Sequence, residues 1–130
     1  MLESAVDDFS FLFWIIAFFV LSPIVLGLLL LGLQKRVRLI HASAGIAKNG
    51  YFGYSWSYLI FGWCVPIYRG EIGIGVLHLL IALISVGLSQ LIFPFIYNRQ
   101  YMNRMLTSGW LLDSTDPNYE LALQRLDIVR

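Results

Sequence analysis

Charged residues are scarce in this chain of 130 residues, and their scarcity indicates the class of protein. They make up 13% of the sequence, against roughly 25% in an average soluble domain, while hydrophobic residues make up 58%. A soluble core does not need such an excess of apolar side chains. We therefore predict an integral membrane protein. The net charge of +1 gives no indication of a nucleic acid or an acidic substrate as partner.

Cysteine and histidine are almost missing, which leaves little room for metal or redox chemistry. The one cysteine, Cys64, excludes an internal disulfide, and its apolar surroundings favour a packing thiol over a reactive one. His41 and His78 are the two histidines, and no Cys/His cluster has metal-ligand spacing. No serine has a credible histidine and acid partner. We expect a protein that is not an enzyme and that holds no cofactor and no metal.

Three apolar runs predict an all-α membrane protein with three transmembrane helices. The first and third runs exceed the roughly 20 apolar residues that a helix needs to cross a bilayer. The middle run is short, so it is either a locally mismatched span or a re-entrant or interfacial helix interrupted near Pro66. We expect one membrane domain over residues 1–130, with spans at about 11–33, 54–68 and 72–97 and a C-terminal tail at 98–130.

A basic stretch follows the first run and predicts the orientation of the chain. No acidic residue occurs between Gln34 and Tyr54, and cytoplasmic loops carry an excess of Lys and Arg near span ends. The acidic N-terminus, which does not resemble a cleaved signal peptide, is then outside and the C-terminus inside. An anionic-lipid contact is the alternative interpretation of the same residues. They are Lys35, Arg36, Arg38 and Lys48.

The C-terminal tail predicts a short amphipathic helix. Asp116 followed by Pro117 is typical of a helix start, with the carboxylate as N-cap and proline in the first turn. Apolar residues then recur at helical spacing, at Tyr119, Leu123, Leu126 and Val129.

Small and polar residues recur along the third predicted span. They are spaced by three and four residues, which places them on one helix face between bulky aliphatic neighbours. Small residues let two helices approach closely, and hydroxyls can bond across such a contact. We interpret the set as a helix-packing seam; a polar-lined path or an oligomer interface is the alternative. The seam consists of Gly75, His78, Ala82, Ser85 and Ser89.

Aromatic and glycine motifs in the middle of the chain resemble the HrgC-like group of small bacterial membrane proteins. The resemblance covers roughly residues 50–112. It implies a bacterial inner-membrane location without an established enzymatic activity, and it supplies no functional residue. The motifs are Tyr54-Ser55-Trp56, Phe61-Gly62, Val65-Pro66-Ile67-Tyr68-Arg69-Gly70, Tyr97-Asn98, Tyr101, Met105-Leu106 and Gly109-Trp110.

Two functions from different classes fit these features. The first is a non-enzymatic accessory or structural subunit of the inner membrane, which packs its seam on a larger membrane complex or on copies of itself. The second is a pore-forming or transport protein, such as a holin-like protein or small channel. The lipid bilayer is a partner in both.

Overall fold

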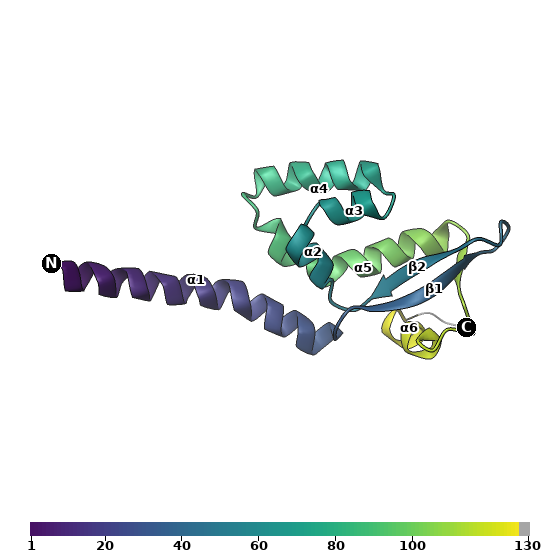
Figure 1. Cartoon of the computed structure of the whole chain (residues 1–130), viewed down its shortest axis with the longest axis horizontal. Coiled ribbons are helices and arrows are strands. Elements are labelled where there is room, and N and C mark those ends of the chain that lie inside the picture. Colours follow the sequence, from purple (N-terminus) through teal and green to yellow (C-terminus); the bar gives the residue numbers. More distant parts are fainter. Residues whose placement is uncertain (128–130) are drawn as a thin grey trace.

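The computed structural model describes residues 1–127 and combines helices with a small antiparallel sheet (Figure 1). The expected all-α fold with three spans is therefore wrong. Among the described residues, a single helix is long and apolar enough to cross a bilayer. The elements are α1 (Leu2–Leu31), β1 (Lys35–His41), β2 (Ala47–Phe52), α2 (Trp56–Phe61), α3 (Cys64–Tyr68), α4 (Ile72–Ile84), α5 (Ser89–Thr107), β3 (Trp110–Leu112) and α6 (Tyr119–Arg125).

Helix α1 extends away from the rest of the chain (Figure 1). Its 30 residues give a length of about 45 Å at 1.5 Å per residue. Gly27 is its one buried residue, and the ring of Tyr54 lies directly over the Gly27 backbone. A side chain at Gly27 would therefore displace Tyr54. The helix ends at Gly32, whose φ of 73° is costly for other residues.

The basic stretch after α1 forms a β-hairpin instead of a loop. Val37 and Leu39 are fully buried while Arg36 and Arg38 are exposed, the alternation of a half-buried strand. β1 pairs with β2 in antiparallel register, with Val37 opposite Gly50, and with β3 on its other side. The charge of this stretch predicted a cytoplasmic loop, but the alternation of its apolar residues determines the structure.

The predicted middle span is divided into two short helices. The Ser55 side chain accepts a hydrogen bond from Tyr58 N and so starts α2 as an N-cap. Gly62, with φ of 59°, ends α2, and α3 begins two residues later. Neither helix is long enough to cross a bilayer, because each covers six residues or fewer. The expected span at 54–68 is therefore wrong.

The predicted third span is a helical hairpin. The chain reverses between α4 and α5, where Val86 and Gly87 have φ of 54° and 83°. Gly87 N donates to Ala82 O, and Leu88 N donates to Ser85 O, so the turn satisfies its own backbone groups. The expected span at 72–97 is wrong because this reversal returns the chain before α4 reaches the length of a span.

The main core lies between the sheet, α5 and α6. Gly50 leaves room for Met102, because an added Cβ would lie 2.7 Å from the Met102 sulfur. Ala122 of α6 and its C-cap residue Leu126 complete this cluster, so the predicted amphipathic helix is present. Its N-cap is Asn118 instead of Asp116, and the predicted position Val129 lies outside the described residues.

Candidate functional site at the polar end of the hairpin

A cleft of about 650 Å³ opens between the β-hairpin and helices α2 and α3. We call it the interfacial cleft, because its lining combines polar and apolar side chains. Its polar lining consists of Gln34, Arg36, Ser57 and Arg69. Its apolar lining includes Trp56, Phe61, Val65 and Tyr68. A volume in this range is typical of small-molecule sites.

Arg69, at the C-cap of α3, is a half-buried cation that lines the cleft. Its guanidinium carbon lies 4.0 Å from the ring centroid of Tyr51, 4.9 Å from that of Tyr101 and 5.1 Å from that of Tyr97. Burial lowers the pKa of Arg69, and the three tyrosines oppose that shift. Its Nη1 donates to Asn98 Oδ1 at 3.0 Å. A half-buried cation is thus held by rings and an amide oxygen.

Arg36 lies beside this group. It stands opposite Tyr51 in the β1–β2 register, so the Tyr51 ring has one arginine as its cross-strand neighbour and another stacked on it. No carboxylate oxygen among residues 1–127 lies within 4.0 Å of a side-chain nitrogen of Arg36 or Arg69. The cleft therefore contains two positive charges without an acidic partner in the described chain.

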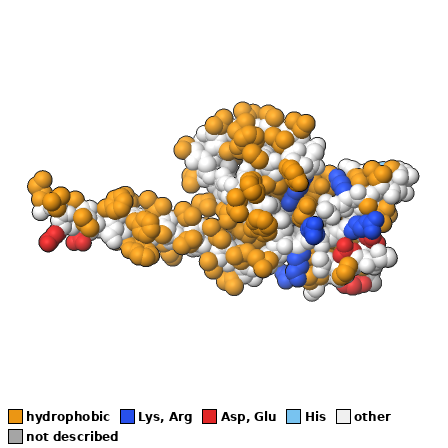
Figure 2. Space-filling model, viewed as in Figure 1, with side chains coloured by type: hydrophobic (Ala, Val, Ile, Leu, Met, Phe, Trp, Pro, Cys, Tyr) orange, Lys and Arg blue, Asp and Glu red, His pale blue; other side chains and the backbone are white. Residues whose placement is uncertain are grey.

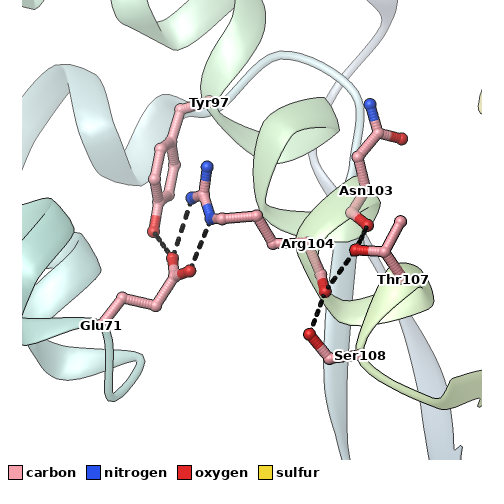
Figure 3. A network of polar contacts seen from close by, with 6 residues as sticks. All are labelled: Glu71, Tyr97, Asn103, Arg104, Thr107 and Ser108. Atoms are coloured by element: carbon pink, nitrogen blue, oxygen red, sulfur yellow. Dashed lines mark hydrogen bonds and ion pairs between the residues drawn. The ribbon is translucent and has the colours of Figure 1, made fainter.

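Glu71 and Arg104 form a second, self-compensated polar group nearby (Figure 3). Arg104 Nε donates to Glu71 Oε2 at 2.6 Å, and Nη2 donates to Oε1 at 2.9 Å. Tyr97 OH donates to the same Oε1 at 3.3 Å. The hydrogen bond with Glu71 is the main cause of the raised pKa of Arg104, and burial opposes it. This fork fixes the start of α4 to the second half of α5.

Gln34 joins the end of α1 to α2 and α5. Its Oε1 accepts from Asn98 Nδ2 at 2.8 Å and from the Ser55 and Ser57 hydroxyls at 3.2 Å each. Asn98 Nδ2 also donates to Gly53 O at 3.2 Å. One side chain shortly after α1 is thus hydrogen-bonded to both α5 and the start of α2.

The predicted seam faces other parts of the same chain. Gly75 lies against Ile67 of α3, and His78 Nδ1 is 2.7 Å from the Tyr58 hydroxyl of α2. Ser89 is buried at the start of α5, Ala82 is partly buried, and Ser85 lies in the turn. The five positions therefore do not lie along one continuous helix.

The structure brings three of the predicted basic residues together, because Arg36, Arg38 and Lys48 line one open cleft beside Asp116. Arg36 also lines the interfacial cleft, Arg38 lies 3.7 Å from Asp113, and Lys48 lies 4.5 Å from the Trp110 ring centroid. Burial lowers the pKa of Lys48, and Glu71 opposes that shift. Lys35 is exposed.

Sequence reasoning missed Arg69 and Glu71 because the three-span layout placed them in an outside turn, across the membrane from Arg104. The Glu71–Arg104 ion pair is incompatible with that layout. Tyr97, Tyr101 and Arg104 stand at i, i+4 and i+7, and this helical face was the available signal.

The described site offers positive charge, hydroxyl groups and aromatic rings. In the described part of the chain, no three or more His, Cys, Asp or Glu side chains are grouped to hold a metal ion. Comparison with protein-family models, curated proteins and solved structures gives no match. The arrangement of charges and rings is therefore the basis for a functional proposal, and the resemblance to the HrgC-like group stays a prediction.

Proposed function

We propose that the protein is a small non-enzymatic accessory protein of the bacterial inner membrane. α1 is its single span, with the N-terminus outside and the C-terminus in the cytoplasm. The α4–α5 hairpin enters the cytoplasmic leaflet and returns to the same side. The sheet and α6 then lie at the cytoplasmic surface, and α1 meets a membrane-protein partner or a second copy within the bilayer.

One observation carries this proposal: apolar side chains cover α1 and continue over the region of α2 to α4 (Figure 2). At the turn of the hairpin, Ile84 and Val86 are 83% and 89% exposed. Soluble proteins rarely expose apolar surface on this scale. A bilayer would cover the apolar surfaces of α1 and of the hairpin together.

The length of α4 supports entry without crossing. Its 13 residues extend about 20 Å, against about 30 Å for the hydrocarbon core. No charged residue occurs between Glu71 and Arg99, so α4 and the first half of α5 suit the leaflet. Gln90 Nε2 donates to Leu59 O at 2.5 Å, which satisfies a carbonyl near the end of α2.

The distribution of charge supports the orientation. Lys35 and Arg36 follow α1 directly, and Arg104 is ion-paired to the start of the hairpin on the same side. The acidic residues Glu3 and Asp7 lie near the other end of α1. Positive residues near span ends favour the cytoplasm.

Single cysteines test this arrangement in a Cys64→Ser background. With a membrane-impermeant maleimide on intact cells, Ser4→Cys should be labelled at once and Ser114→Cys only after the membrane is opened. Val86→Cys at the turn should resist labelling under both conditions. Labelling of Val86→Cys from outside would show that the hairpin crosses, and the proposal would fail.

The accessory role requires a partner surface, and α1 offers one because its first half contacts no other element. Native mass spectrometry in mild detergent should show a homo-oligomer or a co-purifying membrane protein. A variant with residues 9–26 scrambled keeps the apolar composition and serves as the control; it should insert but lose the partner. A strict monomer in both samples would contradict the role.

A further inference from the structure

We propose that the interfacial cleft binds the phosphate headgroup of an anionic phospholipid, with Arg36 and Arg69 as its two cationic contacts. The inference rests on the membrane location proposed above, because the lipid enters from the leaflet that holds the hairpin. It adds a ligand site that the accessory role does not require.

The state of Arg69 is the first argument. Three tyrosine rings and Asn98 fix its guanidinium, yet no described carboxylate neutralises it. A half-buried charge is partly desolvated, and a bound anion compensates for that loss. The neighbouring Arg104 differs from Arg69, because its guanidinium group is already paired with the Glu71 carboxylate.

The position of Arg36 is the second argument. It lines the same cleft from the opposite wall, so a phosphate seated there meets two guanidinium groups. Planar guanidinium forks match the oxygens of a phosphate in pairs. Ser57 lines the same cleft, but its hydroxyl already donates to Gln34 Oε1, so the two arginines are the contacts available to an anion.

The apolar lining of the cleft indicates an amphiphile as the ligand instead of a free phosphate. Trp56, Phe61 and Tyr68 are 45%, 59% and 92% exposed, although they are large aromatic side chains. Tyr and Trp concentrate at the level of lipid headgroups. Acyl chains can leave the cleft along these rings toward the lipid-facing side of α2 and α3.

A second cleft near α6 lacks the same features. It also contains two arginines, Arg99 and Arg125, between apolar residues of α1 and α5. Arg99 is already paired with Asp127, at 3.4 Å. In the interfacial cleft, by contrast, neither arginine has a described carboxylate partner.

The test uses the full chain in detergent, titrated with phosphatidylglycerol or phosphatidylcholine and followed by native mass spectrometry. We expect phosphatidylglycerol to bind at least about tenfold more tightly than phosphatidylcholine. Arg36→Gln should remove most of that preference. Lys35→Gln removes the same charge one residue away, outside the cleft, and should retain the preference to within about twofold.

Arg69→Gln and Arg69→Lys refine the assignment. Both should weaken the preference, because lysine keeps the charge but not the planar fork that stacks on the rings. Near-ultraviolet circular dichroism checks that each variant is folded. If Arg69 variants unfold, Arg36→Gln decides the question, since its side chain is exposed and outside the core.

Two results would overturn the inference. Equal loss in Arg36→Gln and Lys35→Gln would show general attraction to a basic surface. Displacement of the lipid by glycerol 3-phosphate at equal concentration would show a site for soluble phosphate instead. Neither result changes the labelling pattern of Val86→Cys, so failure of the lipid site and failure of the membrane arrangement are distinguishable.

Discussion

Helix α1 and the α4–α5 hairpin are both strongly apolar, but they relate to the rest of the chain in opposite ways. α1 buries one residue, Gly27, and projects away from the other elements (Figure 1). The hairpin buries Gly75 and His78 against α3 and α2, and α5 continues into the core of the sheet. We infer that α1 is a removable anchor, whereas the hairpin is part of the fold. Free energies of unfolding in mild detergent can test this difference.

The largest effect is expected for Gly75→Leu. The side chain would collide with Ile67 and force α4 away from α3, and overpacking of this kind costs about 1–3 kcal/mol. Gly73→Leu is the matched control in the same helix, because nothing lies within 4 Å of an added Cβ there. The control should be neutral or slightly stabilising, since glycine is unfavourable within a helix. Equal losses in the two variants would mean that α4 does not pack on α3.

Glu71→Gln should have the next largest effect. It removes the carboxylate that fastens the hairpin to Arg104, and bonds to charged groups are worth about 1.5–3 kcal/mol. The Arg104 side chain is 31% exposed, so solvent screening reduces the expected loss to about 1–2 kcal/mol. Asp127→Asn breaks an exposed pair with Arg99 and should cost less than about 0.5 kcal/mol. Chemical denaturation of both variants makes the comparison.

Tyr58→Phe should have a smaller effect. It removes the hydroxyl that contacts His78 Nδ1, and such bonds between membrane helices average about 0.6 kcal/mol. Tyr68→Phe removes a hydroxyl from a side chain that is 92% exposed and should change nothing measurable. If Tyr68→Phe lowers the free energy of unfolding as much as Tyr58→Phe does, the hydrogen bond to His78 does not explain the effect of Tyr58→Phe.

The smallest effect is expected from shortening α1. Residues 2–16 are all exposed, so their deletion should change the free energy of unfolding of the remaining chain by less than about 0.5 kcal/mol. The same deletion should release the protein from carbonate-washed membranes more readily, because the shortened helix no longer spans them. A loss of several kcal/mol would show that α1 belongs to the fold after all.

Part of this architecture was open to prediction from the sequence. The first apolar run predicts a long helix, and the spacing of Tyr119, Leu123 and Leu126 predicts α6. Both signals depend on local periodicity or length alone. These two helices can therefore be predicted without knowledge of the tertiary structure.

The β-hairpin and the breaks in the apolar runs depend on single residues that have little effect on average hydropathy. Gly87 and Gly62 reverse or end helices inside apolar runs, and an average over a window does not register a single glycine. Val37 and Leu39 alternate with arginines, so the charge obscured a strand. The sequence did not predict the site, because Arg69 contacts Tyr97 and Tyr101 only when the α4–α5 hairpin brings α5 back beside α3.

The reversal at residues 85–88 also bears on biogenesis. In the arrangement proposed above, with the chain turning inside the leaflet, Glu71 and Arg99 remain on the side where they are synthesised. The acidic side chains that cross the hydrocarbon core with α1 include Glu3, Asp7 and Asp8. Insertion of the hairpin then needs no translocation step, and it can follow after the sheet has emerged from the ribosome and folded.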